Sequence, residues 1–333
     1  MFALTTLVYP VVLALLCVGA GLLVDRCSGG WLPGALLPTV GVAALIALSQ
    51  LTTYVPHLVA ATPYVMAAAA LAGFALAWPR VRMLARNWRR WRWQTVAPVL
   101  AYLLALAPVL LAGRTTFSSY LTLSDSAFHM MGADFLLRHG QDFAHLDLHN
   151  SYGEYINYYY NAGYPSGADT LFGGSAYLLG LPLIWAFQPF NAFVLATAAG
   201  PAWLILRRMG LAGPWAALGA LTATVPALVY GYELIGSIKE ITSLGLILTL
   251  GALVLVHRRW LRGRSAGVVP FALVAAGGIS ALGAGFAAWV LAAVLVLAAV
   301  AGASIRADAS GGSRLLQLIA VGVPVTLVAA LPT

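Results

Sequence analysis

Residues 123–129 read Leu-Ser-Asp-Ser-Ala-Phe-His, and they belong to a polar segment, 114–169, that interrupts an otherwise apolar chain. This segment holds six of the ten acidic residues: Asp125, Asp134, Asp142, Asp147, Glu154 and Asp169. It also holds four of the six histidines: His129, His139, His145 and His149. Because the reactive side chains are concentrated here, we expect any chemistry that the protein performs to take place in this segment.

The chain as a whole has the composition of a multi-pass membrane protein. Hydrophobic residues make up 61% of it, charged residues 8%, and the mean hydropathy is +0.88, which is more apolar surface than a soluble core of this length could bury. The net charge of +8 comes from arginine, since Lys239 is the single lysine. Arginines at the ends of apolar stretches indicate membrane topology rather than nucleic-acid binding. Cys17 and Cys27 indicate neither a disulfide framework nor a metal cluster.

Apolar stretches long enough to cross a bilayer lie on both sides of the polar segment. Four precede it, near 3–23, 32–52, 58–78 and 95–112. Others follow near 186–206, 214–231, 241–256 and 315–331. The longer stretch 268–301 is expected to form a pair of helices, because it is interrupted by Gly277, Gly278, Gly283 and Gly285. The sequence therefore predicts an all-α polytopic membrane protein with about ten transmembrane segments.

The two ends of the chain carry expectations of their own. The first apolar stretch lacks a basic leader region and a small-residue cleavage site, so we expect a retained helix rather than a signal peptide. The sequence stops directly after an apolar run, and we expect that a C-terminal portion is missing.

The arginines predict the orientation of the helices. Six arginines lie between the third and fourth stretches: Arg80, Arg82, Arg86, Arg89, Arg90 and Arg92. The positive-inside rule places this segment in the cytoplasm, so the loop 113–169 and the N-terminus are expected outside a cell membrane. Later basic clusters, at 207–208, 258–264 and 306–314, fall on the same side. Charged residues are nearly absent at hydrocarbon depth, which argues against a proton-coupled transporter.

The polar segment predicts a helix over 125–139 that lies along the membrane interface. Ser124 suits an N-cap and Gly140 a C-terminal stop. Phe128, Met131 and Phe135 share one face, which we expect to point toward lipid or the membrane domain. A second, apolar helix is expected near 166–179, ended by a glycine and a proline.

Asp125 and His129 are four residues apart and are predicted neighbours on this helix. They could form a catalytic pair, in which His129 orients the carboxylate. Equally, Asp125 could serve the helix dipole as a first-turn carboxylate, and His129 could be its simple partner. Asp134 and Arg138 form an ordinary pair at the same spacing and are predicted to be structural.

Residues 147–164 are dense in tyrosine and asparagine, which suit a sugar site and a membrane interface equally well. His145, Asp147 and His149 alternate along the sequence, as metal ligands on an extended strand could. A solvated loop is the favoured interpretation, so we assign no metal ligand. Whether a divalent metal acts as a cofactor is left open. A second external segment, 230–240, contains Glu233 and the neighbours Lys239 and Glu240.

Lys239 and Glu240 have two interpretations. The plainer one is a local ion pair at the start of a helix. In the other, Lys239 meets a lipid phosphate, while Glu233 or Glu240 serves a metal or a sugar hydroxyl.

The order of these parts over residues 95–333 resembles the GT-C superfamily, integral-membrane glycosyltransferases that include protein mannosyltransferases and aminoarabinose transferases. The resemblance rests on Asp125 early in an external loop, Tyr164-Pro165-Ser166-Gly167 before Leu171-Phe172-Gly173, and a span ending in Leu206-Arg207-Arg208-Met209-Gly210. Two features depart from the family pattern. Residues 1–94 add three transmembrane helices and a basic cytoplasmic loop, and Ser126 follows Asp125 where many members carry a second acidic residue.

The resemblance implies an inverting transfer of a hexose or pentose from a polyprenyl-phosphate donor to a glycan, lipid or protein acceptor at the outer face. Asp125 then matches the base or acceptor-orienting residue, with His129 beside it. We expect Lys239, Glu240, Glu233 and Tyr164 to bind substrate. The alternative is a non-catalytic membrane protein, either a transporter of lipid-linked sugars or an assembly subunit, with membrane lipids and no nucleic acid as partners.

Overall fold

The computed structural model describes residues 1–333 apart from 122–123, 145, 262, 306–310 and 332–333. The described residues are 83% helical and contain no strand, which confirms the all-α prediction.

Six helical stretches among the described residues are long and apolar enough to cross a membrane. They cover Leu4–Ser28, Gly34–Tyr54, Pro56–Leu76, Leu183–Arg208, Ile238–Leu255 and Ser265–Leu282. The pair α12 (Gly213–Thr224) and α13 (Ala227–Ile235), bent by 52°, makes a seventh if it forms one span. Apolar helices of this length are typical of a membrane protein.

The chain begins with three long helices that pack closely together. They are α1 (Tyr9–Ser28, continuing η1, Leu4–Val8), α2 (Leu37–Tyr54, after η2, Gly34–Leu36) and α3 (Thr62–Leu76, after η3, Pro56–Ala61). Glycine permits the close approach, because a Cβ atom at Gly41 would overlap the carbonyl oxygen of Cys17, and one at Gly73 would overlap that of Gly19. Small residues at such crossings are a common way to pack helices in membranes.

Helix α2 also packs against helices from the second part of the chain. Its neighbours there are α9 (Gly167–Leu178), α14 (Ile238–Leu255) and α16 (Val269–Leu282). One hydrophobic core therefore runs through both 1–94 and 95–333.

The connection after α3 and the next span carry the arginines. Here α4 (Trp78–Arg86) has no buried residue, and α5 (Trp88–Ala105) continues into α6 (Ala107–Ala112). The polar segment then forms α7 (Ser124–His139), α8 (Ser151–Ile156), η4 (Asn157–Asn161) and α9. The predicted helices at 125–139 and 166–179 are confirmed, and Gly140 and Gly180 end them at φ +67° and +61°.

The remaining helices complete the bundle. They are α10 (Leu183–Thr197), α11 (Ala199–Arg208), α12, α13, α14, α15 (Arg258–Leu261), η5 (Ser265–Val268), α16, α17 (Ala284–Ile305) and α18 (Gly311–Ala330). The predicted break within 268–301 is confirmed and falls at Gly283, where φ is +65°. Gly277 and Gly278, which we expected to interrupt the stretch, lie inside α16, because their small size admits Ala43 and the ring of Phe286.

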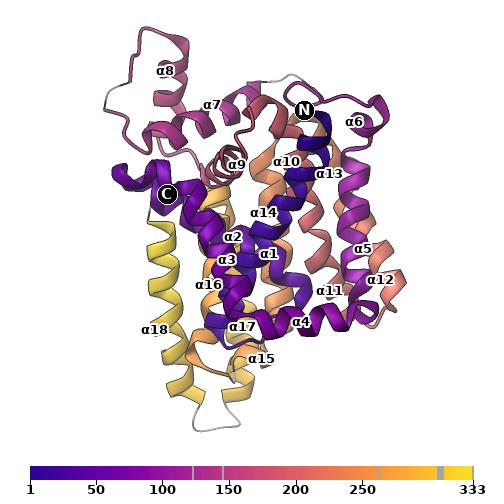
Figure 1. Cartoon of the computed structure of the whole chain (residues 1–333). Helices are drawn as coiled ribbons and strands as arrows, with labels where there is room; N and C mark the ends of the chain where they lie inside the picture. The colour runs from indigo at the N-terminus through magenta and orange to yellow at the C-terminus, as the bar shows by residue number, and fades with distance from the viewer. Residues whose placement is uncertain (122–123, 145, 262, 306–310, 332–333) are drawn as a thin grey trace.

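The two ends of the bundle differ in character (Figure 1). Helices α7, α8 and α9 gather at one end, which we name the loop end, while α4 and α15 lie at the other, the basic end.

The apolar face of α7 packs differently from our expectation. Phe128 and Phe135 are buried against Ile156 and Tyr160, with Met131 at the edge of the same cluster. The stripe therefore faces the second half of its own loop rather than lipid, because the tyrosine-rich residues supply enough apolar surface to form a small separate core.

Candidate functional site

Asp169 is a buried carboxylate that joins three elements of the loop end. It lies in the first turn of α9 and is 1% exposed. Its Oδ1 is 2.8 Å from Nδ1 of His129 on α7, and its Oδ2 accepts a hydrogen bond of 2.7 Å from the hydroxyl of Tyr160 on η4. A buried carboxylate is costly unless its oxygens find such partners, so the three side chains hold α7, η4 and α9 together.

The predicted contact between His129 and Asp125 is wrong. His129 is 1% exposed and its Nδ1 faces Asp169, whereas Asp125 is exposed one turn earlier. The spacing of four does place both residues on one side of α7. His129, however, points into the protein, where it is the partner that the buried carboxylate of Asp169 needs. His129 therefore positions α7 and does not orient Asp125.

Tyr164 is the point where the two predicted external segments meet. The Nζ atom of Lys239 lies 4.2 Å from the centroid of the Tyr164 ring, a cation–π contact between α14 and the loop. The pKa of Tyr164 is raised, first by burial and then by the negative charges of Asp169, Glu240 and Asp125. Three other predicted site residues, Asp125, Lys239 and Glu240, thus lie within electrostatic reach of the Tyr164 side chain. We call these three residues together with Tyr164 the Tyr164 junction.

Lys239 and Glu240 also form the predicted local ion pair, with 3.6 Å between Nζ and Oε1. Their side chains are 23% and 32% exposed, so both remain partly open to solvent or a ligand. The ion pair and the contact with Tyr164 occur together, and the ammonium group is fixed between them.

An aromatic cluster around Phe128 packs against Tyr164 of the junction. The Phe128 ring lies 4.4 Å from Tyr159, 4.9 Å from Tyr160 and 4.7 Å from Tyr164, measured between centroids. Tyr158, by contrast, is 71% exposed. Some loop tyrosines therefore build a core, and others are available to a sugar or to the membrane interface, so both sequence interpretations stay open.

Glu233 lies inside the bundle rather than at the Tyr164 junction. It is fully buried, and its Oε1 accepts a hydrogen bond of 2.6 Å from Nε2 of Gln188 on α10. Its backbone oxygen accepts one from Asn191 at 3.2 Å. The expected role in binding a metal or a sugar hydroxyl is not supported by this position, because the side chain faces α10 and has no exposed surface.

The expected structural pair is present on the outer side of α7. Nε of Arg138 lies 2.8 Å from Oδ1 of Asp134, and the Tyr177 hydroxyl donates to the same carboxylate. Asp147 likewise has a structural role, since it accepts hydrogen bonds from the backbone of His149 and the side chain of Asn150. His145 lies outside the described residues, and within them no group of three His, Cys, Asp or Glu side chains could hold a metal ion.

The contacts of Asp169 with His129 and Tyr160 were not predicted. The available signal was an aspartate within an apolar helix, which a fold tolerates only with partners. No protein-family model matches the chain, and no curated protein or solved structure is significantly similar to it.

Proposed function

We propose that the protein is a membrane glycosyltransferase that moves a sugar from a polyprenyl-phosphate donor to an acceptor hydroxyl at the loop end. The observation that carries this proposal is the Tyr164 junction, where an exposed carboxylate and a lysine come from separate parts of the chain. A transfer of this kind needs both groups, one to take a proton and one to meet phosphate.

The proposed topology has ten spans, with the N-terminus and the loop end outside. Beyond the six long apolar helices, the bent pair α12 and α13, helix α5, and two shorter apolar helices, Ala284–Val300 and Leu316–Ala330, supply the others. Arginines of α4, α5 and α15 lie at the opposite end from α7, as the positive-inside rule requires for a cytoplasmic basic end (Figure 1).

Asp125 is the proposed base. Its carboxylate is exposed, and no described residue donates a hydrogen bond to it, so it is free to accept the proton of an incoming hydroxyl. Asp169 is less suited to this role, because both of its oxygens already accept hydrogen bonds and it has almost no exposed surface.

The proposed reaction uses these groups in one step. The acceptor oxygen bonds to the anomeric carbon as the bond between that carbon and the phosphate oxygen breaks. The electron pair leaves with the polyprenyl phosphate, and the acceptor proton passes to Asp125. Attack from the side opposite the phosphate inverts the anomeric configuration. Lys239 offsets the negative charge that grows on the leaving phosphate.

Substitutions at Lys239 test the proposed contact of this residue with the donor phosphate. Binding of polyprenyl phosphate, the shared leaving group of such donors, can be measured by native mass spectrometry of the protein in detergent. Lys239→Ala should weaken binding by about tenfold, the effect of losing one charge-assisted contact, and Lys239→Arg should recover part of it. Arg114→Ala, which removes an exposed cation of the same loop, is the matched control. Equal binding by all variants would leave Lys239 with its local ion pair alone.

A further inference from the structure

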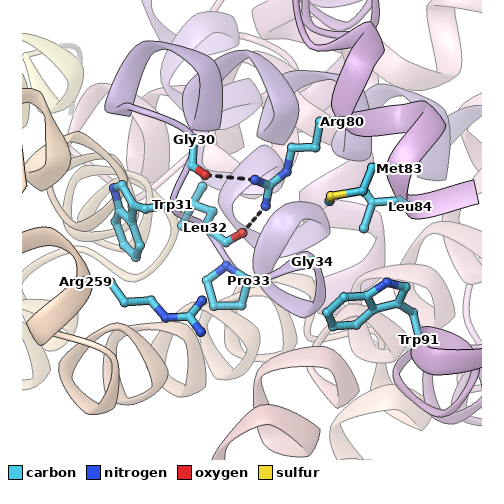
Figure 2. A pocket seen from close by; sticks show the side chains of 10 residues that line it. All are labelled: Gly30, Trp31, Leu32, Pro33, Gly34, Arg80, Met83, Leu84, Trp91 and Arg259. Carbon is cyan, nitrogen blue, oxygen red and sulfur yellow. Dashed lines mark hydrogen bonds between the residues drawn. The ribbon is translucent and has the colours of Figure 1, made fainter. Parts of the chain in front are cut away.

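A cavity lies at the basic end, away from the Tyr164 junction at the loop end. Its volume is about 390 Å³, within the range of small-molecule sites. Figure 2 shows its walls: Trp31 and Pro33 from the connection between α1 and α2, Arg80 from α4, Trp91 from α5 and Arg259 from α15.

The two arginines of this cavity differ in whether their charge has an acidic partner. Arg80 is fixed: its Nε is 3.1 Å from Oδ2 of buried Asp25, and its two terminal nitrogens donate to the carbonyl oxygens of Gly30 and Leu32. The charge of Arg80 is therefore balanced within the protein. Arg259 is exposed and has no acidic partner among the described residues, so its charge at the cavity is uncompensated.

Trp31 forms an aromatic wall of the same cavity. Its Nε1 is buried and has no acceptor among the described residues, while its ring stacks on Trp260 at 6.2 Å.

The cavity borders a long apolar groove. The groove has a volume of about 640 Å³ and shares Gly34, Leu84 and Trp91 with the cavity. It runs between α1 and α5 to Thr6 and Tyr102 near the loop end, past apolar side chains such as Val11, Val99 and Phe193. The cavity and the groove together thus have a cationic end at Arg259 and an apolar length directed along the bundle.

We propose that this site holds an anionic glycerophospholipid from the leaflet at the basic end. The phosphate accepts from Arg259, Trp31 forms a wall beside it, and an acyl chain fills the groove. The apolar groove favours a lipid over a free phosphate. The position at the basic end separates this lipid from the proposed polyprenyl-phosphate donor, whose charge meets Lys239 at the other end. The site therefore does not depend on the proposed function.

The test compares two lipids with identical acyl chains, phosphatidylglycerol and phosphatidylcholine, by native mass spectrometry of the delipidated protein in detergent. The parent should bind phosphatidylglycerol about fivefold more tightly, since one arginine near a membrane surface contributes about that factor. Arg259→Gln should remove this preference, and Arg208→Gln, an exposed arginine outside the cavity, should retain it. Thermal unfolding of each variant shows whether its fold is intact.

Two further binding measurements distinguish the contribution of the lipid headgroup from that of the acyl chains. Val99→Trp, which fills the groove, should weaken both lipids by a similar factor and leave their ratio unchanged. Glycerol 3-phosphate, which has the anion but no chains, should bind far more weakly than phosphatidylglycerol. The proposal is overturned if the parent binds both lipids with equal affinity. It is also overturned if Arg208→Gln loses the preference for phosphatidylglycerol as fully as Arg259→Gln does. Strong binding of glycerol 3-phosphate would show a soluble-anion site and also overturn it.

Discussion

Nδ1 of His129 lies 2.8 Å from Oδ1 of Asp169, forty residues further along the chain, and this contact fastens α7 to α9. The other carboxylate oxygen accepts from Tyr160. Since Asp125 lies on α7 and Tyr164 lies three residues before α9, the contact also sets the relative positions of two members of the Tyr164 junction.

Asp169→Asn should therefore destabilise the protein. Asparagine can accept one of the two hydrogen bonds but presents an N–H group to the other donor, which costs about 1–3 kcal/mol at a buried position. Thermal unfolding in detergent should show a lower midpoint than for the parent. Asp142→Asn makes the same chemical change at an exposed site of the same segment and should unfold like the parent. An Asp169→Asn protein as stable as this control would contradict the assigned role.

The buried tyrosine of this cluster predicts a loss of stability at alkaline pH. Burial and the charge of Asp169 raise the pKa of Tyr160 well above its ordinary value. The unfolded chain releases this proton near pH 10, and the folded chain retains it. The contribution of Tyr160 to stability is thus complete below about pH 10 and declines above it, by about 1.4 kcal/mol per pH unit for one proton.

Tyr160→Phe isolates this contribution. Its free energy of unfolding, measured between about pH 9 and 12, should fall less steeply than that of the parent, by the slope of one proton. Tyr158→Phe, at an exposed tyrosine of the same helical segment, should keep the parental slope. Identical slopes for the parent and Tyr160→Phe would show that Tyr160 does not retain its proton in the folded state.

Glu233 is expected to support the fold and not the substrate. Glu233→Ala leaves the Gln188 amide without its acceptor, which should cost about 1–3 kcal/mol. Glu233→Gln retains an acceptor oxygen at nearly the same position and should unfold within about 1 kcal/mol of the parent. Polyprenyl phosphate should bind both Glu233→Gln and the parent equally. A stable Glu233→Gln protein that no longer binds this lipid would instead place Glu233 at the substrate.

The proposed orientation can be tested with single cysteines. Cys17 is buried and can stay, so only the exposed Cys27 needs replacement by serine. Glu154→Cys at the loop end should react with an impermeant thiol reagent on intact cells, and Asn87→Cys at the basic end should react only after the membrane is opened. Both positions are exposed in the fold. The reverse labelling pattern would place the Tyr164 junction in the cytoplasm.

Local sequence patterns predicted the helices of the loop end well, because caps and glycine stops act over a few residues. Gly140 ended α7 as expected, and Asp134 found Arg138 one turn away. The partner of His129 could not be predicted in this way. Asp169 is distant in sequence, and its pairing depends on how α9 packs under α7, which no local rule describes.

The side chain of Glu233 shows the same limit. It belongs to a segment that also carries Lys239 and was expected to share its surroundings. Helix α13 ends at Gly236, which has φ +77°, and the chain turns there before Lys239 enters α14. Because of this turn, the side chain of Glu233 contacts α10, whereas that of Lys239 contacts Tyr164. Two close neighbours in sequence therefore have different environments.

The central claim is that Asp125 takes the proton of the acceptor hydroxyl, and transfer by Asp125→Asn tests it most directly. Asparagine has nearly the same shape but cannot accept this proton. The variant should be compared with the parent and with Asp142→Asn, after thermal unfolding and polyprenyl-phosphate binding show that its fold and donor site are intact. With a polyprenyl-phosphate sugar as donor, we expect Asp125→Asn to transfer at least about a hundredfold more slowly than the parent, and a rate within about threefold of the parent would contradict Asp125 as the base.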